Sequence, residues 1–196
     1  MHQPSFMATY KRPFEAKDIK VVMYAGGLHE RYGLKKLTEA FMMLPQENFR
    51  LKLFGSGPFV EKLKTKYTKK DSRIQYMGVA PNAEVVAAEL DASLLVNPRP
   101  THEEFTKYSF PSKNIEYMAS GTPLLTTKLP GMPKEYYPYV FLIENESVEG
   151  YAKALESVLA QSDEELYVFG EKAKDFVLEK KNSFEQAKRV IELIKL

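Results

Sequence analysis

Short apolar runs alternate with longer amphipathic stretches along most of the 196 residues. The apolar runs, several of them rich in β-branched side chains, predict strands. They lie at 19–26, 50–55, 73–78, 93–98, 123–127 and 139–144. Stretches in which apolar residues recur every three or four positions predict helices at 33–44, 58–70, 83–91 and 110–120, with two or three more after residue 147.

This alternation predicts an α/β fold, because strands that are separated by helices pair in parallel and are covered on both faces. We expect a Rossmann-like parallel sheet of about six strands with a C-terminal helical tail. The expected division is a linker or N-terminal extension over 1–18 and a single domain over 19–196. Ligands bind such sheets outside the carboxyl ends of the strands, so the chemistry should be sought there.

Composition and charge exclude several classes of protein. The chain has 28 cationic and 26 anionic side chains, a net charge of +2 that gives no indication of a nucleic-acid partner. It has no cysteine, which excludes disulfides and Cys-ligated metal sites. Its three histidines lie far apart and lack ligand spacing, so we expect no metal.

Hydropathy predicts a cytoplasmic protein. No stretch approaches the ~20 apolar residues of a membrane span, and the opening residues lack the apolar core of a secretory signal. Helix 58–70 carries Lys62, Lys66, Lys69 and Lys70 on one face. These lysines form either a solvated face or a contact with an anionic surface, as at the inner face of a membrane.

Glycine turns follow the first two predicted strands. Gly26 and Gly27 follow the first strand, and Gly55 and Gly57 follow the second just before a helix. Uncovered backbone N–H groups at such turns suit a phosphate, although a tight connection explains each turn equally well. The chain lacks both the GxGxxG fingerprint and the Gly-Lys-Ser/Thr of a P-loop at these turns.

The segment from 108 to 123 carries the most specific pattern. Pro111 suits the first turn of a helix, and Gly121 is placed to cap its end. Backbone N–H groups near Ser112, with the charge of Lys113, would cradle a pyrophosphate. Glu116 lies one turn further along, at the offset of a ribose; the alternative is a surface ion pair between Lys113 and Glu116.

Ser-Phe-Pro-Ser-Lys at 109–113, Glu-Tyr-Met-Ala at 116–119 and Gly-Thr-Pro at 121–123 resemble the signature of retaining GT-B glycosyltransferases of family 4. The bacterial cell-surface polysaccharide branch is the most similar. The surrounding order agrees over about residues 19–165: a Gly-Gly-Leu turn, Leu-Phe-Gly-Ser-Gly-Pro, Tyr-Met-Gly, and an apolar strand that runs into Asn-Pro-Arg.

The resemblance implies one half of a larger enzyme. Family members have two Rossmann-like domains, and this chain resembles the C-terminal one, which binds the nucleoside-diphosphate sugar. The partner would be an N-terminal acceptor-binding domain, without which we expect negligible transfer, and no metal or other cofactor is obligatory. Two alternatives are a sugar-nucleotide epimerase-like domain and a degenerate binding or assembly module without transfer activity.

The resemblance also assigns roles by position. Glu116 would bind the ribose, and Ser112 and Lys113 the pyrophosphate, with Lys113 stabilising the leaving diphosphate. The other donor-binding candidates are Gly26, Gly27, Arg31, Gly55, Gly57, Gly78, Val79, Arg99 and Tyr108.

The chain departs from the family at three positions, two of them among these candidates. Many relatives have Glu where this chain has Tyr108, and often Arg and Lys where it has Gly27 and Tyr32. Arg31 stands next to the last of these, and the motif of this branch implies that Lys113 takes over the phosphate charge.

Overall fold

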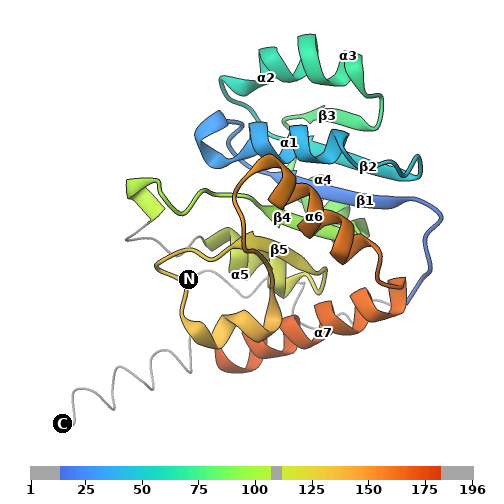
Figure 1. Cartoon of the computed structure of the whole chain (residues 1–196). Coiled ribbons are helices and arrows are strands. Elements are labelled where there is room, and N and C mark those ends of the chain that lie inside the picture. The colour runs from blue at the N-terminus through green and yellow to red at the C-terminus, as the bar shows by residue number, and fades with distance from the viewer. Residues whose placement is uncertain (1–13, 107–111, 182–196) are drawn as a thin grey trace.

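The computed structural model describes residues 14–106 and 112–181. Six strands form one parallel sheet in the order β3-β2-β1-β4-β5-β6 (Figure 1). Their bounds are β1 Lys20–Ala25, β2 Phe49–Phe54, β3 Ile74–Gly78, β4 Leu94–Asn97, β5 Leu124–Thr127 and β6 Phe141–Ile143. The predicted fold class is therefore confirmed.

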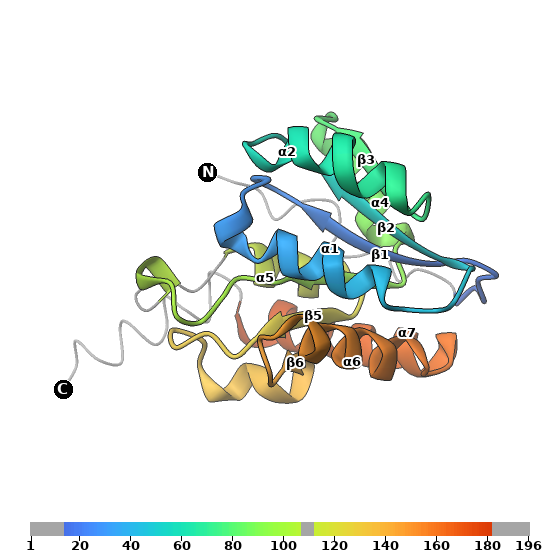
Figure 2. The ribbon, with the colours of Figure 1, turned by 45° about the horizontal axis from the view of Figure 1, so that its top comes forward.

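Helices cover both faces of the sheet (Figures 1 and 2). Helices α1 (Leu34–Met42), α2 (Phe59–Lys62) and α6 (Val148–Leu159) pack on one face, where α1 and α6 lie against each other. Helices α4 (Asn82–Asp91), α5 (Ser112–Ala119) and α7 (Asp163–Lys180) cover the other face. Each face has its own apolar core, as expected of a doubly wound sheet.

Strand order fixes where a ligand can bind. The chain moves outward from β1 to β3, returns to place β4 beside β1, and then continues to β6. In doubly wound sheets such a reversal marks the usual ligand position, here the space between the carboxyl ends of β1 and β4, which we call the crevice. The glycine turns after β1 and β2 and the start of α5, which the sequence analysis singled out, all lie at this edge.

Two predicted elements differ from the structure. The sixth strand begins at Phe141 rather than 139, because Lys134–Tyr139 forms a 3₁₀ helix whose Tyr139 ring stacks on Phe176 of α7 at 4.2 Å. The helix predicted at 58–70 contains a π-helical turn, Leu63–Tyr67, before α3 (Thr68–Lys70). The wide turn suits the four-residue spacing of buried Phe59, Leu63 and Tyr67.

The end of α5 is as predicted. Gly121 adopts the left-handed conformation (φ +77°) that caps the helix, and its N–H donates to the carbonyl of Met118 at 3.1 Å. Across residues 14–106 and 112–181, no helix combines the length and apolar character that crossing a bilayer requires. The domain boundary predicted at residue 18 stays a prediction.

Candidate functional site at the carboxyl ends of the strands

The two glycine turns form a single interlocked layer. The N–H of Leu28 donates to the carbonyl of Ser56 at 2.8 Å, and the Leu28 carbonyl accepts from Phe59 N–H at 2.9 Å. A Cβ on Gly55 would lie 1.9 Å from the Gly26 carbonyl oxygen, and one on Gly57 would lie 2.4 Å from that of Leu28. Backbone contact between the turns therefore requires both glycines, with or without a ligand.

The third strand extends this layer. Gly55 N–H donates to the Gly78 carbonyl at 2.7 Å, and the Tyr76 hydroxyl donates to the Gly55 carbonyl at 3.0 Å. Gly78 has φ +77° and open space where a Cβ would project. Val79 beside it is 75% exposed, so an apolar side chain stands at the outer end of the row of turns.

Helix α5 is tied to the first turn by a buried tyrosine. The Tyr117 hydroxyl donates to the Ala25 carbonyl at 3.2 Å and accepts from Ala25 N–H at 2.9 Å, at the last residue of β1. Burial raises the pKa of this hydroxyl well above its ordinary value, so it stays protonated. These bonds fix α5 beside the Gly26 turn, across the crevice between β1 and β4.

The start of α5 presents the two charged candidates. Lys113 Nζ lies 3.1 Å from Glu116 Oε2, and their side chains are 29% and 39% exposed. Ser112 begins the helix and is exposed. The ion pair that the spacing allowed is therefore formed. Because both groups remain accessible, a ligand can exchange its own contacts for theirs.

A second group of cations lies on an aromatic platform after β1 and β4. The Arg99 guanidinium lies 5.1 Å from the ring centre of Tyr32 and 5.7 Å from that of Phe105. Arg31 approaches the same rings at 5.3 and 5.8 Å. The Nε atom of Arg99 is buried and makes no hydrogen bond within the described part of the chain. Each guanidinium group therefore places a positive charge beside the Tyr32 and Phe105 rings.

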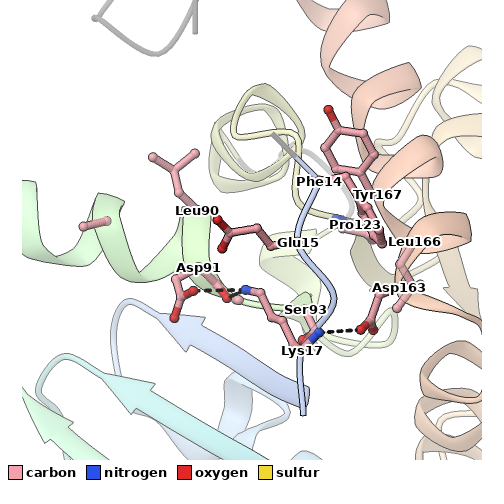
Figure 3. A pocket seen from close by; sticks show the side chains of 12 residues that line it. Phe14, Glu15, Lys17, Leu90, Asp91, Ser93, Pro123, Asp163, Leu166 and Tyr167 are labelled. Carbon is pink, nitrogen blue, oxygen red and sulfur yellow. Dashed lines mark hydrogen bonds and ion pairs between the residues drawn. The ribbon is translucent and has the colours of Figure 1, made fainter. Parts of the chain in front are cut away.

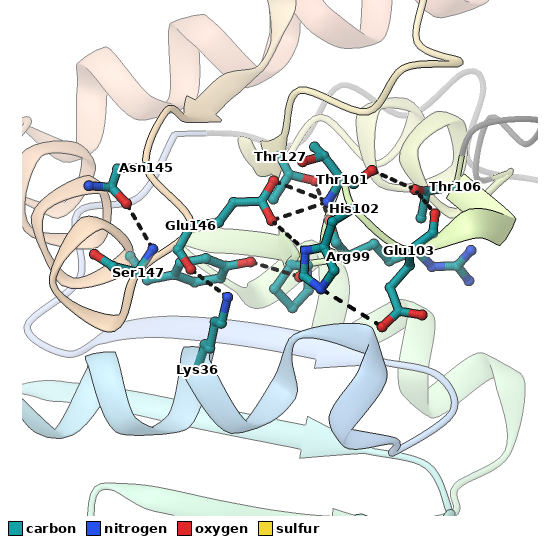
Figure 4. Close-up of polar contacts among 12 residues, drawn as sticks. Lys36, Arg99, Thr101, His102, Glu103, Thr106, Thr127, Asn145, Glu146 and Ser147 are labelled. Atoms are coloured by element: carbon teal, nitrogen blue, oxygen red, sulfur yellow. Dashed lines mark hydrogen bonds and ion pairs between the residues drawn. The ribbon is translucent and has the colours of Figure 1, made fainter.

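The loop that carries Arg99 is anchored from several elements (Figure 4). The Glu146 carboxylate accepts from Thr101 N–H, with both oxygens at 3.1 Å. The Tyr151 hydroxyl of α6 donates to the Pro98 carbonyl at 2.8 Å, and the Thr127 hydroxyl donates to the Arg99 carbonyl. These bonds hold the backbone at Pro98, Arg99 and Thr101 in place relative to β5 and α6.

The described candidates are connected through direct contacts. Lys113 and Glu116 are joined to the Gly26 turn through Tyr117, and that turn to Gly55, Gly57 and Gly78. A Cβ on Gly27 would lie 3.2 Å from the Tyr32 ring, and the guanidinium groups of Arg31 and Arg99 both contact that ring. Tyr108 lies outside the described residues.

Three contributing residues were not identified from the sequence. Tyr117, Phe105 and the fully buried Glu89 of α4 have roles that depend on contacts between distant segments. For Glu89 a signal exists: it shares a helical face with Val85 and Ala92, so an acid stands on an apolar stripe. Within the described residues, no group of three or more His, Asp or Glu side chains is arranged to hold a metal.

A cavity of about 200 Å³ lies at the opposite edge of the sheet (Figure 3). It is lined by residues that precede β4 and β5, such as Ser93 and Pro123, and by Leu166 and Tyr167 of α7. Lys17 bridges it by an ion pair of 3.0 Å to Asp91. None of the candidate residues lines this cavity, so it is separate from the crevice.

Solved structures share this architecture and show which fold it is. The C-terminal domain of a group 1 glycosyl transferase (LpcC) from Francisella tularensis matches with TM-score 0.68 and 19% identity, over 84% of this chain and 87% of that one. Anabaena HepE in complex with UDP and glucose matches with TM-score 0.72 and 15% identity, over 91% of this chain and 48% of that one. The fold is that of a GT-B glycosyltransferase domain.

The sequence places the chain within a family. Residues 8–176 match the model of the glycosyl transferases group 1, and the chain belongs to that family. A putative colanic acid biosynthesis glycosyltransferase, WcaL of Escherichia coli K12, is 30% identical over 112 residues. That match covers 55% of this chain and 27% of WcaL, so the chain aligns with about a quarter of the relative's length.

Proposed function

We propose that this chain is the donor-binding domain of a retaining, family 4 glycosyltransferase that acts in surface-polysaccharide synthesis. It would hold a nucleoside-diphosphate sugar in the crevice between β1 and β4 and require no metal. An acceptor-binding domain would complete the active site, as the chain's half-length match to HepE suggests. The name of WcaL supports the polysaccharide assignment.

The observation that carries this proposal is the accessible Lys113–Glu116 pair at the start of a helix docked on the first glycine turn. A diphosphate accepts hydrogen bonds from the α5 backbone and from Lys113, where the helix dipole also favours negative charge. Glu116, one turn further along, accepts hydrogen bonds from the two ribose hydroxyls. The ligand therefore replaces one surface ion pair with several charge-assisted hydrogen bonds.

In the transfer reaction the departing diphosphate gains negative charge. A cation already positioned beside it stabilises that charge without reorganisation, which is usually the largest catalytic contribution. Lys113 is the group we assign to this role. Arg31 stands next to Tyr32, where many relatives have Lys, and Arg99 contacts the same Tyr32 ring; we assign these two cations to the outer phosphate and the sugar.

Calorimetric titration and thermal shift with UDP-, GDP-, ADP- and CMP-sugars test the donor site. A nucleotide at 100 times its dissociation constant should stabilise the fold by about 2.7 kcal/mol. Glu116→Ala and Lys113→Ala should each weaken binding by about 10- to 100-fold, because each removes charge-assisted hydrogen bonds of about 1.5–3 kcal/mol. Glu156→Ala, on the exposed surface of α6, is the matched control and should bind like the unmodified chain.

Each outcome is informative. Selective binding that both α5 variants lose supports the donor site and identifies the base. Binding that neither variant affects would place the nucleotide elsewhere, and no binding by any nucleotide would contradict the proposal. Binding without transfer, once an acceptor domain is supplied, would favour the non-catalytic module.

A further inference from the structure

Glu89 is a fully buried carboxyl group on which the charges of the candidate site act. It lies on α4 with 0% of its surface exposed, and neither carboxyl oxygen makes a hydrogen bond within the described part of the chain. Its backbone carbonyl accepts from the Thr122 hydroxyl at 2.8 Å, so the backbone around it is held in place. A buried carboxylate without partners is costly, and a protein that keeps one has few ways to lower the cost other than protonating it.

Among the described residues, the charged groups that act on Glu89 lie on α5. Glu116 and Lys113 of α5 exert opposite effects on it, and Glu89 in turn acts on the Tyr117 hydroxyl of the same helix. The pKa of Glu89 is raised to about 7, mainly by burial and secondly by the charge of Glu116. The charge of Lys113 opposes both effects. Near neutral pH the carboxyl is therefore poised between its two protonation states.

We propose that Glu89 couples donor binding to proton uptake: when a nucleoside-diphosphate sugar occupies the start of α5, the Glu89 carboxylate takes up one proton from solvent. The inference rests on the proposed function. It makes Glu89 a positioning residue that touches no substrate and acts through Lys113 and Glu116.

The sign follows from charge. The diphosphate brings negative charge to Lys113, the cation that acts on Glu89 among the described residues, and so weakens the effect that favours the ionised carboxyl. Ionised Glu89 is thus less compatible with a bound nucleotide than neutral Glu89. Linkage is reciprocal, so a ligand that raises the pKa of Glu89 must bind more tightly when Glu89 is protonated.

The test is the pH dependence of affinity for the nucleoside-diphosphate sugar that binds most tightly in the panel above. A nucleotide sugar is used because its diphosphate, unlike that of a free nucleoside diphosphate, is esterified at both ends. Affinity should weaken from pH 6 to pH 8, by at most about tenfold per pH unit for one linked proton. Calorimetry at pH 7.2 in buffers of different ionisation enthalpy should show net proton uptake.

Glu89→Gln replaces the carboxyl group with a neutral group of the same shape. It should bind as tightly at pH 8 as at pH 6 apart from any contribution of the histidines, and more tightly than the unmodified chain at pH 8. Glu89→Met, which also removes the titrating group, keeps the test available if the glutamine variant folds poorly. Glu84→Gln, at an exposed position on the same helix, should retain the full pH dependence.

The outcomes separate this inference from the proposed function. A pH dependence that disappears in Glu89→Gln supports the coupling. Tight binding with the same pH dependence in both proteins would overturn the coupling and leave the donor site intact. No binding by any nucleotide sugar at any pH would overturn both.

Discussion

Replacing Glu89 should also change how stability depends on pH when no ligand is present. A carboxyl group with an ordinary pKa of 4.5 and a folded-state pKa of about 7 holds its proton more tightly in the folded protein. The stabilisation that this tightly held proton contributes to the free energy of unfolding is fully present below the unfolded-state pKa and is lost as pH rises through 7. The difference between 4.5 and about 7 corresponds to about 3.4 kcal/mol, at about 1.36 kcal/mol for each tenfold change.

Most of this loss falls within an accessible range of pH. Between pH 5 and pH 8 the unmodified chain should lose about 2.5 kcal/mol of unfolding free energy that Glu89→Gln does not lose. Urea denaturation followed by circular dichroism at pH 5, 6, 7 and 8 measures both curves. Between pH 5 and pH 8 the variant should therefore lose less unfolding free energy than the unmodified chain.

The matched control is Glu84→Gln, which changes an exposed carboxylate on the same helix. Its stability curve should run parallel to that of the unmodified chain. If the Glu89→Gln curve were also parallel, the buried carboxyl would not titrate in this range. That result would refute the reasoning from burial and from the neighbouring Glu116.

Three further substitutions test the contacts that build the site, each measured by urea denaturation. Gly33→Ala should destabilise severely, by about 3 kcal/mol or more, because its Cβ would lie 1.8 Å from the Pro98 carbonyl oxygen at φ +84°. Tyr117→Phe should cost about 1–3 kcal/mol, since it leaves Ala25 without its buried partner, and it should also weaken nucleotide binding. Ser162→Ala should cost about 1 kcal/mol because it removes the capping box of α7, and it should leave nucleotide affinity unchanged. If Ser162→Ala and Tyr117→Phe lost affinity equally, that result would contradict the local role of Tyr117.

The sequence alone was sufficient for the architecture. Strands and helices differ in the period of their apolar residues, and that period is local, so six strands and the helices between them could be predicted from neighbouring positions. The same holds for Gly121, whose capping role depends on the adjacent helix. The ends of elements were less predictable where packing intervened, as at Tyr139, which stacks on Phe176, a residue more than thirty positions later in the chain.

Only the tertiary structure decided how the site is built. In the sequence Gly55 and Gly57 have the spacing of ordinary turn residues, yet the nearby backbone of Gly26 and Leu28 leaves no room for a side chain at either position. The burial of Glu89 depends on how α4 packs in the folded domain; that burial is the main cause that raises its pKa, followed by Glu116, with Lys113 opposing both. Periodicity is encoded within a few residues, whereas desolvation and electrostatic interaction arise only when distant segments meet, which is why the sequence determined the framework and the fold determined the chemistry.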